Sequence, residues 1–201
     1  MNLNSKDIDN LKSLRTTTRN TNNFGMIYHY NDDVIKIFKD GDFIDKYNLE
    51  SHLKELSKLN VNGVALPKEL VYIDGKFKGY TMPYYKGFTL SIILKKIMKG
   101  KIIVTPDEVN RLYNELINKV IELSKLGVKI HDIRPNNIIY YNNELCLIDC
   151  DFYRISNMEN LMEYNISLVE EAVKKYTNNI FNVTKYKDDK LFEFSLDIKS
   201  N

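Results

Sequence analysis

Three polar residues between positions 132 and 149 are of the types that can hold a divalent cation and a hydroxyl group together. Asp132 and Asn137 lie five residues apart in a segment that Pro135 stiffens, and Asp149 ends the next apolar run. Carboxylate and amide oxygens are suitable ligands for a hard cation such as Mg²⁺, and a carboxylate can accept a proton from a hydroxyl group. These residues therefore predict a site at which a metal ion and a hydroxyl substrate meet.

The order of these residues resembles the catalytic loop and the metal-binding aspartate of protein kinases and their relatives. Along the chain the matching positions are Asp132, Pro135, Asn137, Ile138, Ile148 and Asp149. The resemblance implies that Asp132 is the base for the substrate hydroxyl and that Asn137 and Asp149 hold Mg²⁺. It also implies that Arg134 takes the place of the usual loop lysine beside the transferred phosphate.

A short helical turn is predicted at 7–14 and a loop or weak strand at 15–23. A β-hairpin is predicted over 26–38, with turn residues at 31–33 between its strands.

Lys36 occupies an unusual place in the second strand of this hairpin. Alternation puts it on the same face as Val34 and Phe38, although a solvent-facing lysine needs no apolar neighbours on its own face. The strand resembles the kinase strand whose lysine holds the α- and β-phosphates of ATP, and the segment from Gly25 to Ile27 resembles the end of the glycine-rich loop. The other interpretation is a lysine that covers the sheet with its stem. The family loop normally has several glycines, whereas only Gly25 precedes Lys36 here.

A helix is predicted between Asp45 and Asn60, because leucines recur there at helical spacing. In the kinases that the sequence resembles, this helix supplies a glutamate to the strand lysine. Glu55 stands at the usual separation from Lys36 and is preferred, while Glu50 is the alternative. His52 lies at the centre of the leucine stripe, and we interpret it as a core or boundary residue.

Two further strands are predicted at 70–73 and 79–82, joined by the turn Asp74-Gly75. The segment 83–87 that follows resembles the hinge that receives adenine between backbone groups, with Met82 at the gatekeeper position. Pro83 would supply the carbonyl acceptor and Tyr85 the amide donor. An ordinary loop is the alternative interpretation of this segment.

The C-terminal half is predicted to be mostly helical. One helix is expected from Thr89 to Met98, and a longer one begins at Thr105, where an N-cap, a proline and a capping-box glutamate follow one another. Gly127 is expected to close this longer helix.

A hairpin predicted over 138–148 would return Asp149 to the side of Asn137. Asp151 is a second acidic candidate for the metal. One more helix is expected over 160–176, followed by a polar or aromatic tail. The resemblance covers residues 24–152, and the long substrate-docking region of a complete eukaryotic kinase has no counterpart here.

Composition limits the classes of partner. The 201 residues include 43% hydrophobic and 28% charged residues, and the formal net charge of +2 provides no general attraction to nucleic acid or membrane. The two cysteines, Cys146 and Cys150, have neither zinc-binding nor redox spacing and are interpreted as small buried residues. No signal sequence or membrane-spanning run is recognised, so a cytoplasmic protein is expected.

The predicted fold is therefore α+β, a two-lobed protein kinase-like fold with a small β-rich N-lobe (1–84) and a reduced, mostly helical C-lobe (85–201). The expected activity is transfer of the γ-phosphate of ATP, with Mg²⁺, to a hydroxyl group, most simply of Ser or Thr in a protein. The alternatives are a pseudokinase that acts as a binding module and a small-molecule kinase of the aminoglycoside-phosphotransferase type. The predicted nucleotide site comprises Gly25, Ile27, Val34, Lys36, Glu55, Met82, Pro83 and Tyr85.

Overall fold

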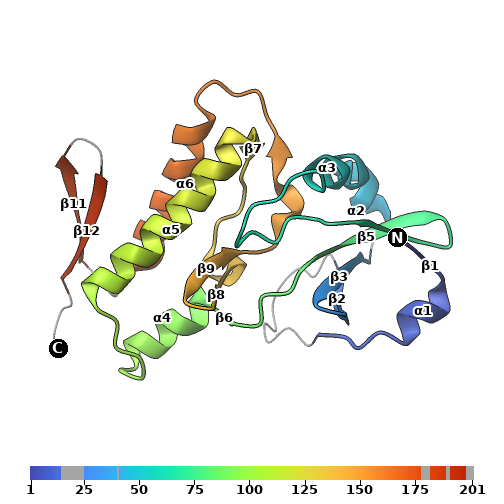
Figure 1. The fold of residues 1–201 in the computed structure, drawn as a ribbon, viewed down its shortest axis with the longest axis horizontal. Helices are drawn as coiled ribbons and strands as arrows, with labels where there is room; N and C mark the ends of the chain where they lie inside the picture. The colour runs from blue at the N-terminus through green and yellow to red at the C-terminus, as the bar shows by residue number, and fades with distance from the viewer. Residues whose placement is uncertain (15–24, 40, 178–181, 189–190, 198–201) are drawn as a thin grey trace. The chain divides into compact units, whose positions relative to one another are not determined.

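The computed structural model describes residues 1–14, 25–39, 41–177, 182–188 and 191–197 (Figure 1). The described residues form an α+β structure with a mixed β-sheet and six α-helices. The chain divides into two units. The first comprises Met1–Tyr84 and Asp149–Ile155, and the second comprises Tyr85–Ile148 and Ser156–Asn201. The short segment Asp149–Ile155 thus belongs to the first unit, although the sequence analysis placed it with the C-terminal lobe.

The first unit is built on a five-stranded sheet with the strand order β1-β4-β5-β3-β2. Its strands are β1 (Asn2–Leu3), β2 (Gly25–Tyr30), β3 (Asp33–Phe38), β4 (Leu70–Ile73) and β5 (Lys76–Pro83). β1 runs parallel to β4, and the other neighbouring strands are antiparallel. The predicted hairpins β2–β3 and β4–β5 are confirmed, while no strand was predicted at β1. The predicted loop or strand at 15–23 lies outside the described residues.

The turns of these two hairpins contain residues with positive φ. Asn31 has a φ of 53°, and Asp74 and Gly75 have φ values of 49° and 78°. Asparagine, aspartate and glycine tolerate this left-handed region better than other residues. At Asp74-Gly75 both central residues have positive φ, the geometry that matches the twist of two antiparallel strands. The turn residues recognised in the sequence thus set the strand pairing.

The helices of the first unit are α1 (Ser5–Asp9), α2 (Gly41–Lys46) and α3 (Leu49–Leu56), and the segment Cys150–Phe152 forms a 3₁₀ turn, η2, before β10 (Arg154–Ile155). The prediction of one continuous helix over 45–60 is wrong, because Asn48 adopts a φ of 48° and separates α2 from α3. Leu49, Leu53 and Leu56 are buried as the leucine spacing predicts. α1 begins at Asn4, where a capping box with Asp7 sets its start ahead of the predicted helical turn at 7–14.

The second unit contains the three longer helices, α4 (Leu90–Met98), α5 (Pro106–Lys125) and α6 (Leu161–Thr177). The predicted start of α5 is confirmed, because the Thr105 side chain accepts a hydrogen bond from the amide of Glu108 at 3.2 Å and Pro106 is the first helical residue. Gly127, with a φ of 74°, follows the end of α5. α5 and α6 lie side by side (Figure 1).

Short strands complete the second unit. β6 (Phe88–Thr89), β8 (Ile138–Tyr141) and β9 (Glu144–Leu147) form a three-stranded sheet in the order β6-β8-β9, and β7 (Val128–Lys129) precedes the 3₁₀ turn η1 (Pro135–Asn137). The predicted hairpin over 138–148 is therefore confirmed. Its turn, Asn142-Asn143, has φ values of 47° and 66°.

No secondary structure was predicted for the polar or aromatic tail, but its described part contains two strands. β11 (Asn182–Asp188) and β12 (Leu191–Asp197) pair as antiparallel strands. The sequence contains a signal for β12, since Phe192, Phe194 and Leu196 recur at every second position.

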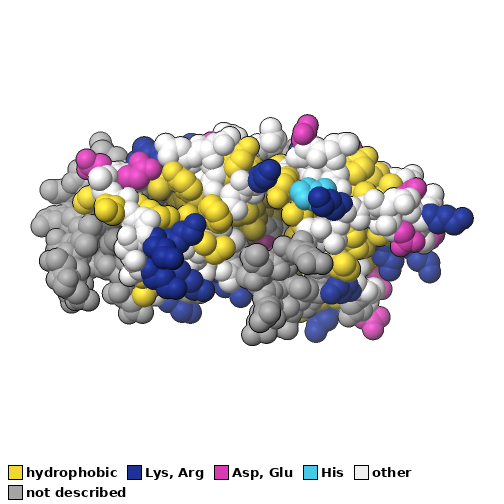
Figure 2. Space-filling view, turned by 90° about the horizontal axis from the view of Figure 1, so that it is seen from below, with side chains coloured by type: hydrophobic (Ala, Val, Ile, Leu, Met, Phe, Trp, Pro, Cys, Tyr) yellow, Lys and Arg dark blue, Asp and Glu magenta, His cyan; other side chains and the backbone are white. Residues whose placement is uncertain are grey.

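Within the described residues, no helix combines the length and the apolar character needed to span a membrane. On the face drawn in Figure 2, basic and acidic side chains are interspersed with apolar ones. This mixture is consistent with the small net charge of +2.

A close backbone approach at Gly79 provides a test of the sheet. Gly79 on β5 lies opposite Ile37 on β3, and a Cβ atom at this position would collide with the carbonyl group of Lys36. We predict that Gly79→Ala lowers the free energy of unfolding by about 2–3 kcal/mol. Chemical denaturation measures the change. Gly41→Ala is the control, because a Cβ at Gly41 meets no atom within 4 Å, and we expect a change below about 0.5 kcal/mol. Equal effects of the two substitutions would contradict the close approach.

Candidate functional site

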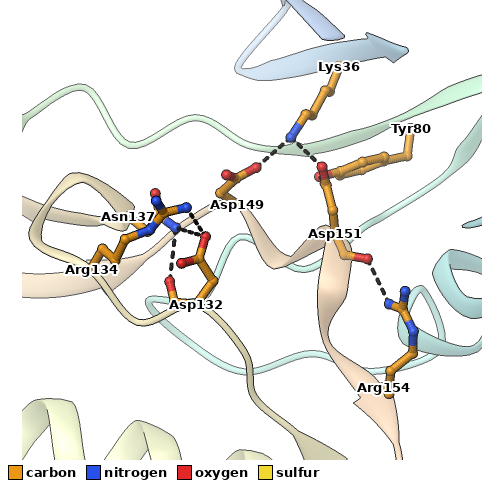
Figure 3. Close-up of polar contacts among 8 residues, drawn as sticks. All are labelled: Lys36, Tyr80, Asp132, Arg134, Asn137, Asp149, Asp151 and Arg154. Atoms are coloured by element: carbon orange, nitrogen blue, oxygen red, sulfur yellow. Dashed lines mark hydrogen bonds and ion pairs between the residues drawn. The ribbon is translucent and has the colours of Figure 1, made fainter. Parts of the chain in front are cut away.

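The first cluster of polar residues lies in the first unit and is centred on Lys36 (Figure 3). The Lys36 Nζ atom lies 2.5 Å from Asp149 Oδ1 and 2.5 Å from Asp151 Oδ2. The hydroxyl group of Tyr80 donates a hydrogen bond to Asp151. Lys36, Asp151 and Tyr80 are buried. A buried ammonium group is therefore paired with two carboxylates, one of which is also hydrogen-bonded to a tyrosine.

Opposite charges in this cluster stabilise the charged form of Lys36. Burial by itself lowers the pKa of Lys36, but the negative charges of Asp151 and Asp149 outweigh this effect and hold the pKa above its ordinary value. Lys36 therefore remains protonated throughout the physiological pH range. Burial and the negative charge of Asp151 raise the pKa of Tyr80 well above its usual range, so its hydroxyl remains a hydrogen-bond donor.

The sheet and the η2 turn position the members of this cluster. Lys36 on β3 lies opposite Tyr80 on β5 in the strand register. Asp149 has a φ of 62° and directly precedes η2. The ring of Phe152, at the end of η2, packs edge-on against Tyr47, with the ring centres 5.5 Å apart. Long-range packing therefore holds the turn that carries both aspartates.

The second cluster lies in the second unit and is centred on Asp132 (Figure 3). Arg134 donates a hydrogen bond to the Asp132 carboxylate. The Asn137 side-chain amide lies 3.2 Å from Asp132 Oδ2 and 3.0 Å from the Asp132 backbone carbonyl. The three residues that the sequence assigned to one catalytic loop thus contact one another.

The loop that carries Asp132 alternates between buried and exposed residues. Ile130, Ile133 and Pro135 are buried, whereas Asp132 and Arg134 are exposed. The apolar residues fix the backbone, and the polar side chains between them reach solvent. This pattern explains how a short segment can present a carboxylate without a regular strand or helix beneath it.

Asn165 on α6 holds the start of this loop, and the sequence analysis did not identify it. Asn165 is completely buried. Its Oδ1 atom accepts a hydrogen bond from the amide of Ile130 at 3.0 Å, and its Nδ2 atom donates to the carbonyl of Val128 and to Ser124 Oγ, each at 2.8 Å. The sequence signal that could have identified Asn165 was its position between Leu161 and Val169, on the apolar stripe of the predicted helix.

Asp132 and Asp149 share a rare backbone conformation. Their φ values are 58° and 62°, in the left-handed region that most L-residues avoid. Residues held in this region cluster at functional sites, where the surrounding structure maintains the strain. The two aspartates with the leading chemical roles in the sequence analysis are thus both held in unusual conformations.

The structure corrects the expected partner of Lys36. Glu55, the preferred candidate, forms an ion pair with Lys58 at 2.8 Å, and Glu50, the alternative, accepts a hydrogen bond from the hydroxyl group of Tyr72 at 2.8 Å. The ammonium group of Lys36 is paired with Asp149 and Asp151 instead. Glu50 and Glu55 are both exposed on α3, whereas Lys36 is buried.

Of the remaining residues predicted to bind nucleotide, all but Tyr85 lie on the neighbouring strands β5, β3 and β2. Ile27 on β2 lies opposite Lys36 on β3, and Val34 on β3 lies opposite Met82 on β5. Gly25 begins β2, and Pro83 ends β5. Tyr85 belongs to the second unit, where its backbone carbonyl accepts a hydrogen bond from the amide of Gly87 at 3.0 Å. Adenine binding at these residues remains a prediction.

The oxygen donors of Asn137 and Asp149 suit a hard cation. The Asp149 side chain is 42% exposed, so its carboxylate is accessible from solvent. The amide of Ile148, the residue directly before Asp149, donates to the backbone carbonyl of Asn137 at 2.9 Å. Among the described residues, no group of three or more His, Cys, Asp or Glu side chains is arranged to hold a metal. Mg²⁺ commonly completes its coordination with water and nucleotide phosphates. Asn137 belongs to the second unit and Asp149 to the first, and joint binding of Mg²⁺ by these residues remains a prediction.

The two cysteines are buried and unpaired with each other, as the sequence analysis predicted for small core residues. Burial, together with the nearby charge of Glu144, raises the pKa of Cys146 to about 11. Burial and Asp149 raise the pKa of Cys150 as well. Neither thiol is therefore activated as a nucleophile near neutral pH.

No protein-family model matches this sequence, and the search of curated proteins found no match either.

The hydrogen bonds of Asn165 generate a prediction about the loop that they support. Asn165→Ala removes three buried hydrogen bonds and leaves the amide of Ile130 without its partner, so we expect the free energy of unfolding to fall by about 3 kcal/mol. Urea denaturation measures this loss. Asn157→Ala, at an exposed position, is the matched control. A loss below about 0.5 kcal/mol for Asn165→Ala would contradict the assigned role.

Proposed function

We propose that this protein is an ATP- and Mg²⁺-dependent phosphotransferase with a compact, two-lobed kinase-like fold. The observation that carries the proposal is the Lys36 cluster, in which a permanently charged ammonium group is held on a sheet beside a partly exposed aspartate. A charged amine of this kind is suited to the α- and β-phosphates of a nucleotide. The order of Lys36, Asp132, Asn137 and Asp149 along the chain supports the same function.

In this proposal different residues bind the phosphates of ATP and the Mg²⁺ ion. Lys36 contacts the phosphates, and the oxygens of Asn137 and Asp149 hold Mg²⁺. When bound, the metal ion neutralises charge that develops on the phosphate oxygens during transfer. The proposal requires the Asp132 cluster and the Lys36 cluster to act on the same nucleotide.

Asp132 is assigned to the acceptor hydroxyl. The hydroxyl oxygen forms a new bond to the γ-phosphorus while the bond between that phosphorus and the β,γ-bridging oxygen breaks, so ADP is the leaving group. Asp132 takes the hydroxyl proton, and Arg134, whose guanidinium contacts Asp132, lies beside the transferred phosphate. Positioning and charge stabilisation supply most of the acceleration.

The acceptor is proposed to be a Ser or Thr hydroxyl of a protein, because Pro135 and the pair Ile138-Ile139 resemble the protein-kinase loop. A small-molecule hydroxyl, as in the aminoglycoside-phosphotransferase type, is the alternative within the same chemistry. The partners in the proposal are ATP and this acceptor, with no nucleic acid or membrane, and the protein is proposed to act in the cytoplasm.

A pseudokinase is the second candidate, and a specific observation favours it. Lys36 is not paired with a helix glutamate, since Glu55 pairs with Lys58. In a pseudokinase the same residues would bind nucleotide or a partner protein without turnover. Retention of Lys36, Asp132, Asn137 and Asp149 together favours the active enzyme, because a binding module has no chemical need for all four.

The role of Asp132 is tested with the purified full chain, radiolabelled ATP, Mg²⁺ and a generic protein acceptor. We predict that Asp132→Asn lowers transfer at least about 100-fold and leaves ATP affinity nearly unchanged, because the side chain acts on the acceptor. Glu163→Gln, an exposed substitution on α6, is the control. Equal transfer by the wild type and Asp132→Asn would exclude Asp132 as the base. A wild type that binds MgATP without transfer to any acceptor tested would favour the pseudokinase.

The metal role of Asp149 is tested by nucleotide binding. We predict that Mg²⁺ tightens ATP binding to the wild type and that Asp149→Ala removes this effect, because the substitution deletes a carboxylate ligand. Thermal shift at increasing Mg²⁺ concentrations provides the measurement. The control is Asp45→Ala, at an exposed position of α2. An unchanged Mg²⁺ requirement in Asp149→Ala would refute the assignment.

A further inference from the structure

The two carboxylate partners of Lys36 lie in different surroundings. The Asp151 side chain is 2% exposed and accepts a second hydrogen bond from Tyr80, whereas the Asp149 side chain is 42% exposed. The backbone carbonyl of Asp151 also accepts a hydrogen bond from Arg154 at 2.8 Å. Asp151 is therefore fixed from several directions, while Asp149 borders solvent.

In the kinases that the sequence resembles, a helix glutamate pairs with the strand lysine. Here the two candidate glutamates on α3 have other partners. Glu55 on α3 is paired with Lys58, and the Glu55 side chain is 51% exposed. Glu50 accepts a hydrogen bond from Tyr72. Lys36 is nevertheless buried, and a buried charge needs a counter-charge that stays with it.

We propose that Asp151 is the positioning residue that holds Lys36 for the nucleotide phosphates, taking the place of a helix glutamate, and that Asp149 is the exchangeable partner. This assignment rests on the proposed function. When Asp149 turns to a metal ion, Lys36 keeps one buried carboxylate and does not become an unpaired charge. Asp149, directly before η2, thus serves the metal ion, and Asp151, within η2, holds Lys36.

Removal of either carboxylate has a different consequence in this account. In Asp151→Asn, Asp149 becomes the single carboxylate partner of Lys36 and competes with phosphate for the ammonium group. In Asp149→Asn, Lys36 remains on Asp151, and its orientation is unchanged. Both substitutions remove one negative charge beside the same ammonium group, so a general change in electrostatic potential acts on both in the same direction.

Metal-free binding of ADP and adenosine tests the assignment. Calorimetric titrations in the presence of a chelator use the full-length wild type, Asp151→Asn and Asp149→Asn. We expect Asp151→Asn to weaken ADP binding at least about fivefold, with adenosine unchanged, and Asp149→Asn not to weaken ADP binding. Glu55→Gln identifies the rival residue, because a helix-glutamate role predicts the loss of ADP affinity in that variant.

The outcomes separate this assignment from the proposed function. ADP binding by the wild type with equal changes in the two aspartate variants would overturn the role of Asp151 and leave the phosphotransferase proposal standing. A loss in Glu55→Gln as large as that in Asp151→Asn would overturn it too. A wild type that binds MgATP but not metal-free ADP would overturn this assignment alone. One that binds neither MgATP, ADP nor adenosine would overturn the proposed function together with this assignment.

Thermal unfolding without nucleotide tests the pairing itself. Asp151→Asn is expected to lower the unfolding midpoint by about 5 °C or more relative to Asp149→Asn, because Asp151 is the buried partner. Added to Lys36→Met, the same substitution is expected to raise the midpoint, since it removes the carboxylate that Lys36→Met leaves unpaired. An equal drop in both backgrounds would mean that Asp151 does not act through Lys36, and would overturn the assignment.

Discussion

The ion pairs of Lys36 are the constraint on which the first unit depends. A buried ammonium group on a β-strand is stable when carboxylates lie within contact distance, because the cost of removing a charge from water is large. Two aspartates meet that requirement at 2.5 Å, and they come from a segment more than 110 residues further along the chain. The strand register, the η2 turn and the packing of Phe152 all serve to bring this segment to the sheet.

In the second unit a neutral side chain, that of Asn165, holds the loop that carries Asp132. A short loop must present the carboxylate of Asp132 while its backbone stays in place, and buried Asn165 supplies the hydrogen bonds that a regular sheet would otherwise provide. The loop then places Arg134 and Asn137 on the same carboxylate. In the first unit a buried ammonium group holds the side chain of a partly exposed aspartate, whereas in the second unit a buried amide holds the backbone near an exposed one.

The sequence predicted the features that depend on neighbouring residues. The hairpin turns were recognised because asparagine, aspartate and glycine tolerate positive φ, and α5 was recognised from its N-cap at Thr105. Alternation placed Lys36 on one face with Val34 and Phe38, and motif order grouped Asp132 with Asn137. The features that were missed depend on distant residues or on a single backbone angle. The ion pair between Lys36 and Asp151 spans 115 positions, and the break at Asn48 follows from one left-handed residue within an otherwise helical pattern.

The central claim of this account is that the Lys36 cluster binds nucleotide phosphates. The most direct measurement is a calorimetric titration of MgATP and of adenosine into the wild type and into the double variant Lys36→Met/Asp151→Asn, which removes both buried charges together. The account predicts one-site binding of MgATP to the wild type, at least about tenfold weaker binding to the double variant, and equal adenosine affinities. Equal MgATP affinities in two folded proteins would contradict the claim.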